Sequence, residues 1–509
     1  MVSTSIPAPA SLQEALALVG ELLAEKRCLE LRVQALERRL FGPRSEKLNL
    51  EDHQIPLLEE VFKNPVPAAT TDVVVPEAPA GQPSEKTARR KPVRRPLPEH
   101  LEVVEERLEP ASKSCGRCGR EQCLVREECT ERLDIIPAKL IRRRTVRPVY
   151  ACGSCKDQPP VQVPMPPQVI EKGLCGPGLL SHVILSKYLD HRPLYRVQQE
   201  LGRHGVEVTR STLSDWVNAV AAALEPLQQR LRQDLVGGDY LQLDETPVKV
   251  IDPDLLGRTA TGWLWVYARP GGPVLFDFQG RRGREGPERM LRDFRGTFQS
   301  DGYGVYESIE RQRPDLRRVG CWAHARRKFH EALEDDAARA REFIAWIARL
   351  YAVEKEAREQ GLTPEARKAL RGERVPEVLA RLRGRLEELE PGKPASPVLL
   401  KSPLGMAIRY TLGQWDALVR YLEDGRFEID NNLVENAIRP TAVGKKNWLF
   451  IGHPEAGWRS AVIYSLLITA RRAGLDPAKW LEDVFRRIPT ATTANLHELL
   501  PGNWKPATT

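Results

Sequence analysis

The sequence predicts a multidomain α/β protein. Three observations carry this prediction: apolar residues at heptad spacing near the N-terminus, two Cys-x-x-Cys pairs, and alternating strand-like and helix-like segments that bear isolated acidic residues. The 509 residues are enough for roughly three domains of about 150 residues each. With 41% hydrophobic residues, the chain can also bury a core.

The composition excludes several classes of protein. A formal net charge of +8, from 77 Lys and Arg against 69 Asp and Glu, is only mildly basic, so the placement of charge matters more than its sum. No apolar run approaches the roughly 18 residues of a membrane span, and the first residues lack a secretory signal. Nine cysteines, several in Cys-x-x-Cys pairs, are typical of a metal site in a reducing cytosol. We therefore expect a cytoplasmic protein with no membrane contact.

Residues 1–48 are predicted to contain a coiled coil. Apolar residues repeat at sevenfold spacing in two registers three residues apart, which is the a/d pattern of such a helix. The registers are Leu12, Val19, Lys26, Val33 and Leu40, and Ala15, Leu22, Leu29 and Leu36. The alternative is an amphipathic helix packed on its own domain. A coiled coil would join protomers into a homo-oligomer, and residues 49–98, rich in proline and basic at their end, are predicted to be a linker.

Residues 99–172 are predicted to form a zinc ribbon. Each Cys-x-x-Cys turn can present two thiolates to one tetrahedral Zn²⁺, and the two pairs together supply four ligands. The pairs are Cys115 with Cys118 and Cys152 with Cys155. The 33 residues between the pairs exceed the usual spacing, and Cys123 and Cys129 remain competing ligands.

A basic segment lies between the cysteine pairs. Its arginines alternate with apolar residues, which predicts a strand with one basic face suited to contact with the DNA backbone. These arginines are Arg142, Arg143, Arg144 and Arg147.

Residues 173–234 are predicted to form a helix-turn-helix-like domain. Two helices are expected over Leu179–Leu189 and Leu194–His204, and Gly205 ends the second. A third begins after Thr209, whose hydroxyl is suited to an N-cap, and Arg210 at its start is a predicted DNA contact. The alternative is an ordinary three-helix bundle.

Residues 235–455 are predicted to form a ribonuclease H-like catalytic domain. Three successive strand-like runs, a helix, a strand, and then further helix and strand occur in the order of that fold. The strand-like runs begin at Tyr240, Gly262, Val274, Thr297 and Arg318, and the helix-like run spans Glu285 to Phe294. A charge-dense helical stretch over about residues 330–400 is predicted to be an insertion, and residues 456–509 a helical tail.

Three acids are the candidate catalytic residues of this domain. Asp244 and Asp301 each follow a strand-like run, and Glu435 lies in a helix-like one. Carboxylates are preferred ligands of Mg²⁺, and two such cations can clamp the attacking and leaving oxygens of a phosphodiester displacement. Singly, each acid has a plainer interpretation: a turn cap for Asp244, a turn dipeptide with Gly302 for Asp301, and a surface helix acid for Glu435.

Two neighbouring acids are left out of the candidate site. Glu245 is expected to point to the opposite face of the strand from Asp244. Asp430, the rival third acid, is expected to cap the helix that bears Glu435.

Basic and aromatic residues follow Glu435. Lys445, Lys446 and Trp448 could hold phosphates and stack a base at a cut end. Arg439, four residues after Glu435, would steer the carboxylate or a phosphate, or form a plain salt bridge. His324 has no Cys or His at ligand spacing and is interpreted as a packing or phosphate-contact residue.

Together these segments resemble the insertion-sequence-66 family of bacterial DDE transposases over nearly the whole chain. The motifs that carry the resemblance are Leu40-Phe41-Gly42, Arg95-Pro96-Leu97-Pro98, the cysteine pairs, Ser186-Lys187-Tyr188, Leu243-Asp244-Glu245-Thr246-Pro247, Ser300-Asp301-Gly302-Tyr303, Trp322-Ala323-His324-Ala325-Arg326-Arg327-Lys328-Phe329, Asp430-Asn431-Asn432, Glu435-Asn436-Ala437-Ile438-Arg439-Pro440, Lys446-Asn447-Trp448-Leu449-Phe450 and Glu498-Leu499-Leu500-Pro501. The resemblance implies a ribonuclease H-like domain with Asp244, Asp301 and Glu435 as its acids, a zinc finger around the cysteine pairs, and a helical insertion before the glutamate.

The function expected from these observations is DNA transposition. The N-terminal parts would bind the terminal repeats of the element, and the acids would hold two Mg²⁺ (or Mn²⁺) ions for strand cleavage and strand transfer. The partners would be double-stranded DNA at the transposon ends and target, with possible accessory proteins, in the bacterial nucleoid. The alternatives are a non-catalytic DNA-binding protein and a structure-specific nuclease of the same fold.

Overall fold

The computed structural model of the chain describes residues 26, 139–150, 161–171, 173–252 and 259–506. The chain divides into two compact units, one of Met1–Arg44 with Arg143–Thr509 and one of Ser45–Arg142. Lys26 is helical and exposed. The rest of the predicted coiled coil, the linker and the four predicted zinc ligands lie outside the described residues.

The basic segment before the second cysteine pair is not the strand that its alternation predicts. Residues 139–148 have no regular secondary structure, and only β1 (Val149–Tyr150) pairs, antiparallel, with β2 (Val161–Gln162). Arg142, Arg143 and Arg144 are all exposed, and Arg147 donates from Nη1 to the carbonyl of Val163 at 3.0 Å. Alternation therefore does not mark one buried face here, because almost every side chain of the segment is in solvent.

The three helices expected in the next segment are confirmed. They are α3 (Pro177–Tyr188), α4 (Leu194–Arg203) and α5 (Arg210–Val236). Thr209 caps α5 as predicted, since its Oγ1 accepts a hydrogen bond from the backbone N–H of Thr212 at 3.2 Å. The buried side chains of these helices share one apolar core with the sheet that follows.

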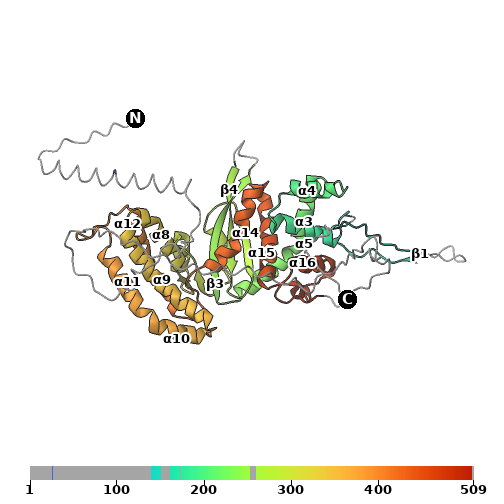
Figure 1. Ribbon diagram of the computed structural model, residues 1–509. Helices are drawn as coiled ribbons and strands as arrows, with labels where there is room; N and C mark the ends of the chain where they lie inside the picture. Colours follow the sequence, from blue (N-terminus) through green and yellow to red (C-terminus); the bar gives the residue numbers. More distant parts are fainter. Residues whose placement is uncertain (1–25, 27–138, 151–160, 172, 253–258, 507–509) are drawn as a thin grey trace, which may run out of the picture. The chain divides into compact units, whose positions relative to one another are not determined.

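A five-stranded mixed sheet forms the centre of the larger unit (Figure 1). Its strands are β3 (Tyr240–Ile251), β4 (Thr259–Ala268), β5 (Val274–Gln279), β6 (Gly296–Gln299) and β7 (Leu316–Val319). The spatial order is β5-β4-β3-β6-β7; β3, β4 and β5 are antiparallel neighbours, whereas β6 and β7 run parallel to β3. Helices α6 (Glu285–Leu291) and α7 (Gly304–Gln312) connect the later strands.

The C-terminal helices complete this core. They are α14 (Asn432–Trp448), α15 (Gly457–Arg472) and α16 (Pro477–Arg487). Helix α15 covers the edge strand β5: Ser465 Oγ accepts from the N–H of Phe276 at 2.8 Å, and Thr469 Oγ1 accepts from that of Val274 at 3.1 Å. These hydroxyls satisfy backbone groups that a sheet edge otherwise leaves open.

The predicted insertion is helical, as expected, and its helices form one bundle with their neighbours (Figure 1). The helices between β7 and α14 are α8 (Trp322–Glu331), α9 (Ala337–Glu359), α10 (Pro364–Arg374), α11 (Pro376–Glu388), α12 (Pro403–Gly413) and α13 (Trp415–Val419). Short 3₁₀ turns span Ala332–Glu334, Arg420–Leu422, Pro454–Ala456, Ile488–Thr490 and Leu496–Leu499. Among the described residues, no helix is long and apolar enough to cross a membrane.

Candidate active site

The fold brings the three predicted acids together. Asp244 lies on β3, Asp301 lies two residues beyond the end of β6, and Glu435 is in the first turn of α14. Strands β3 and β6 are parallel neighbours in which Gln242 pairs with Gln299, so the two aspartates follow at equivalent positions along adjacent strands. The charges of Asp301 and Glu435 both act on Asp244, which places all three carboxylates within electrostatic reach of one another.

The carboxylates of this cluster repel one another. Burial, followed by repulsion from Glu245, Asp301 and Glu435, raises the pKa of Asp244 well above its ordinary value. Glu435 Oε1 is buried and accepts no hydrogen bond from any described residue. Among the described residues, no group of three or more His, Cys, Asp or Glu side chains lies close enough together to hold a metal ion. The donor set is all carboxylate oxygen, which is the chemistry that Mg²⁺ and Mn²⁺ accept.

The loop that carries Asp301 is held from the insertion. The N–H of Gly302 donates to the hydroxyl of Tyr410 on α12 at 3.1 Å, and a Cβ at position 302 would lie 2.7 Å from the Tyr410 ring. Asp301 Oδ1 accepts from the N–H of Tyr303 at 3.0 Å. The turn interpretation of Asp301-Gly302 is therefore also fulfilled, and it leaves the second carboxylate oxygen, Oδ2, without a described hydrogen bond.

Two buried glutamines connect the strands that bear the aspartates to the segment that leads into α14. Gln242 Nε2 donates to Gln299 Oε1 at 2.8 Å and to the carbonyl of Asp430 at 3.0 Å. Gln299 Nε2 donates to the carbonyl of Glu428 at 2.8 Å. Each glutamine stands two residues before an aspartate, on the same face of its strand. Neither glutamine was predicted from the sequence. The available signal was that each stands two residues before a candidate acid, Asp244 or Asp301.

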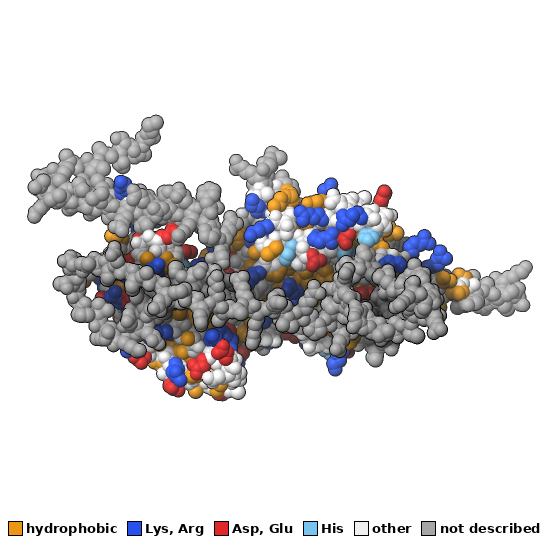
Figure 2. Space-filling model, in the orientation of Figure 1, with side chains coloured by type: hydrophobic (Ala, Val, Ile, Leu, Met, Phe, Trp, Pro, Cys, Tyr) orange, Lys and Arg blue, Asp and Glu red, His pale blue; other side chains and the backbone are white. Residues whose placement is uncertain are grey.

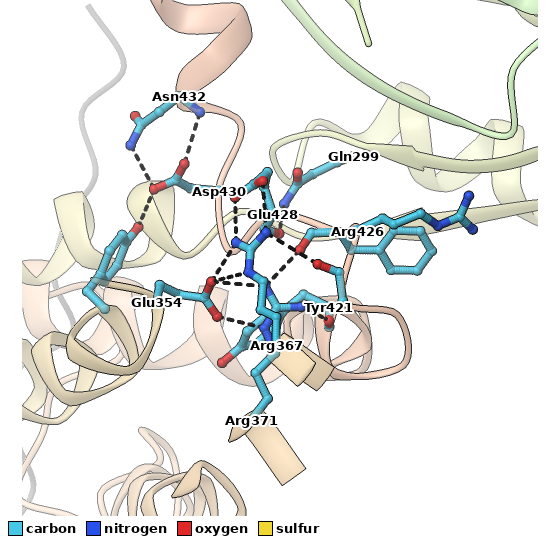
Figure 3. Close-up of polar contacts among 12 residues, drawn as sticks. Gln299, Glu354, Arg367, Arg371, Tyr421, Arg426, Glu428, Asp430 and Asn432 are labelled. Atoms are coloured by element: carbon cyan, nitrogen blue, oxygen red, sulfur yellow. Dashed lines mark hydrogen bonds and ion pairs between the residues drawn. The ribbon is translucent and has the colours of Figure 1, made fainter. Parts of the chain in front are cut away.

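The insertion fixes the same segment through a buried ionic network (Figure 3). Glu354 on α9 accepts from Arg367 at 2.5 Å and from Arg371 at 2.7 Å, and Arg371 and Glu354 are wholly buried. Arg367 also binds Glu428 at 2.7 Å, and Arg371 donates to the carbonyl of Phe427 at 2.8 Å. The peptide just before α14 is thus held on one side by the sheet and on the other by the insertion.

The side chain of Asp430 forms hydrogen bonds within the same network. Its Oδ2 accepts from the Tyr351 hydroxyl at 2.8 Å and from the Asn432 amide at 2.7 Å, and its Oδ1 accepts from the Asn432 N–H at 3.1 Å (Figure 3). The last bond satisfies the N–H of Asn432, the first residue of α14, but Asn431 and not Asp430 stands at the N-cap position, so the capping role expected for Asp430 is only partly met. Glu245 is occupied as well: it accepts from Arg282 at 2.5 Å and from the Tyr306 hydroxyl at 2.6 Å.

Helix α8 contributes two side chains to the acids that the sequence analysis did not assign there. His324 Nε2 lies 3.8 Å from Glu435 Oε1, and Arg327 Nη2 lies 3.4 Å from Glu435 Oε2. Burial lowers the pKa of His324, opposed by the charges of Asp301 and Glu435. The sequence offered little sign of this contact, because more than a hundred residues separate His324 and Arg327 from Glu435. The available signal was that both residues stand in one short motif.

The predicted DNA-contact residues lie in different surroundings. Lys445 Nζ donates to Thr246 Oγ1 and to the carbonyl of Pro247, both at 2.8 Å, and so ties α14 to β3. Trp448 is half-buried against the core, with Lys187 Nζ 5.8 Å from its ring centroid. Lys446, Arg439 and Arg210 are exposed.

Comparison with known families covers most of the chain. The family described as "Transposase IS66 family" matches residues 172–459, and "IS66 C-terminal element" matches residues 465–501. "Transposase C of IS166 homeodomain" matches residues 28–105. "Zinc-finger binding domain of transposase IS66" matches residues 112–156, which include both Cys-x-x-Cys pairs.

Three relatives from Sinorhizobium fredii match over nearly their full length. The uncharacterized protein y4jD is 35% identical over 94% of this chain and 95% of its own. The uncharacterized proteins y4qI and y4hP are 34% and 31% identical, over 93% and 94% of this chain and 88% and 89% of their own. The family match spans more than half of the chain and contains Asp244, Asp301 and Glu435. The chain therefore belongs to the IS66 family of transposases.

Proposed function

We propose that the protein is a DNA transposase that cuts and joins strands at Asp244, Asp301 and Glu435 with Mg²⁺ or Mn²⁺. The observation that carries the proposal is the convergence of these carboxylates from β3, β6 and α14, with Glu435 Oε1 buried and without a described hydrogen-bond donor. Neighbouring carboxylates repel one another, and a bound cation would relieve the repulsion that Asp301 and Glu435 exert on Asp244.

The fold supports the proposal. Three antiparallel strands followed by two parallel ones in the order β5-β4-β3-β6-β7 agree with a ribonuclease H-like domain. Asp244 lies on the central strand and Asp301 at the end of the strand beside it, so rigid elements fix both aspartates.

Each group of residues at the site has a separate role in the proposed reaction. Asp244, Asp301 and Glu435 would hold the divalent cations, which supply an activated water or 3′-hydroxyl and stabilise the leaving oxygen. His324 and Arg327 flank Glu435 and orient its carboxylate, and Gln242, Gln299 and the insertion network keep the segment before α14 in place. No covalent enzyme intermediate is needed.

Basic surface supports DNA as the substrate. Figure 2 shows Lys and Arg side chains gathered over α3, α4 and the adjoining helix α14. Phosphate contacts from such a surface position DNA without reading its sequence. We assign recognition of the terminal repeats to the helices of residues 173–234 and to a zinc ribbon at Cys115, Cys118, Cys152 and Cys155, and pairing of protomers to a coiled coil within residues 1–48.

The test uses full-length protein, Mg²⁺ and a labelled duplex that carries the end of the element. Asp244→Asn and Glu435→Gln should abolish cutting and joining, by a factor of at least about 10³ in rate, yet keep end binding. Glu225→Gln, at an exposed carboxylate on α5, is the control and should cut like wild type. Binding without cutting by wild type would favour a non-catalytic DNA-binding protein, and cutting without joining would favour a nuclease.

A further inference from the structure

A large basic cavity lies on the outer face of α14, away from the side that packs on the sheet. Its volume is about 1030 Å³, and α8, α9 and α15 supply the other walls. Five arginines and one histidine line it: Arg326, Arg358, Arg439, Arg471, Arg472 and His191. A volume at the upper end of the roughly 300–1,000 Å³ of small-molecule sites suits part of a polymer better than a single metabolite.

The acidic residues that line this arginine cavity do not neutralise its arginines. Its two acids, Glu428 and Asp430, are already engaged, Glu428 with Arg367 and Asp430 with Tyr351 and Asn432. No described carboxylate forms an ion pair with Arg326, Arg358, Arg439 or Arg471. The cavity therefore offers several guanidinium groups to an anionic ligand, and guanidinium groups bind phosphates in a fixed, bidentate geometry.

Two side chains that line the cavity, Arg472 and His191, each have a buried nitrogen atom that forms no hydrogen bond among the described residues. These atoms are Arg472 Nη1 and His191 Nδ1. His191 is held in the left-handed region, at φ 59°, where a non-glycine residue is uncommon. Arg472 Nη2 donates to the carbonyl of Arg269 at 3.2 Å, which fixes the guanidinium at the cavity wall.

The cavity adjoins the catalytic acids. Arg439 stands four residues after Glu435, so the two lie near each other along one side of α14. On α8, Arg326 lines the cavity, while its neighbour Arg327 contacts Glu435. A strand bound in the cavity would thus continue toward the acids around α14.

We propose that the arginine cavity binds the sugar-phosphate backbone of DNA beside the cleavage site. The inference rests on the proposed function, which supplies DNA as the substrate, and adds a second contact region that is distinct from the acids and built jointly by α14, the insertion and α15. The cavity has several unpaired guanidinium groups, so it can contact several phosphates at once. Contact with the DNA backbone requires no particular base sequence.

The experiment measures the salt dependence of binding to a fluorescent 30-base-pair duplex of arbitrary sequence, without divalent cation. Each lost phosphate contact lowers the slope of log K against log [salt] by about 0.7–0.9. Arg358→Gln combined with Arg439→Gln should therefore lower the slope by about 1.5 and weaken binding roughly tenfold at 0.15 M salt. The control removes the same charge outside the cavity, with Arg341→Gln on α9 and Arg311→Gln on α7, both exposed.

Equal slopes for the cavity variant and wild type would overturn the proposal. Equal losses in the cavity and control variants would also overturn it, because net charge alone would then explain the effect. This readout needs no catalysis. If Asp244→Asn still cut DNA, the proposed function would fail while the slope remained interpretable.

Discussion

Lys187 on α3 is a half-buried cation without a carboxylate partner among the described residues. Burial lowers its pKa to about 8, and its ammonium lies 5.4 Å from the ring centroid of Tyr188. Cation–π contact offsets only part of the desolvation cost. The side chain therefore destabilises the folded state at neutral pH.

This gives a pH-dependent prediction. The folded pKa of Lys187 lies below the value of 10.5 for a free lysine, so the unfolded chain binds more protons between these two values. The penalty is fully present below about pH 8 and is relieved as the pH rises toward 10.5. Lys187→Met should raise the free energy of unfolding at pH 7 by on the order of 1 kcal/mol, with less gain at pH 10. Denaturant unfolding at both pH values measures this, and Lys479→Met, at an exposed lysine on α16, should show no such difference.

Gly302 is required by close approach, since its φ is not in the left-handed region. Gly302→Ala would push a methyl group into the Tyr410 ring and displace the loop that carries Asp301. We expect about 1–3 kcal/mol of destabilisation and a loss of Mg²⁺-dependent cutting. Gly304→Ala is the matched control, because nothing lies within 4 Å of a Cβ there. Wild-type cutting by Gly302→Ala, measured alongside its melting temperature, would show that this contact does not position Asp301.

The sequence predicted the role of a residue where residues close to it along the chain determine that role. Thr209 was identified as a cap because a cap needs only its own turn. His324, Gln242 and Gln299 were not placed at the site, because their partners lie far along the chain and only the fold brings them close.

Helices and strands were likewise predicted where local sequence patterns determine them, whereas contacts between distant elements were not. The order of strands along the chain and the three helices before them followed from apolar periodicity and turns, and were confirmed. The strand expected over Arg142–Arg147 was wrong, because alternation in an exposed segment has no core to face. The ionic network between α9, α10 and the segment before α14 could not be foreseen, because charges on amphipathic helices usually face solvent.

The buried pair of Glu354 and Arg371 should be the costliest contact to break in the insertion. Arg371→Met leaves Glu354 with one of its two arginines and leaves the carbonyls of Tyr421 and Phe427 without a donor. We expect a loss of about 3–5 kcal/mol, typical of a buried charge deprived of its partner. Arg374→Met on the same helix removes only an exposed pair with Glu373 and should change stability by less than about 1 kcal/mol. Urea denaturation of both variants checks this, and similar losses would contradict the argument.

The two Cys-x-x-Cys pairs give a prediction about the metal content of the protein. If the zinc assignment is right, purified protein should carry about one Zn²⁺ per chain, and Cys152→Ser should lose it. Cys28→Ser, outside the Cys-x-x-Cys pairs, should retain the metal. Elemental analysis gives the stoichiometry. Retention of zinc by Cys152→Ser would instead point to Cys123 or Cys129 as ligands.

The order of the parts along the chain has a consequence for synthesis. All five strands and both aspartates precede the insertion, whereas Glu435 and the helix that covers the edge of β5 come after it. A ribosome that has just completed β7 has made two of the three acids and a sheet with an open edge. If Asp244, Asp301 and Glu435 form the site as proposed, a gene copy interrupted anywhere between these points would encode a product in which that site is incomplete.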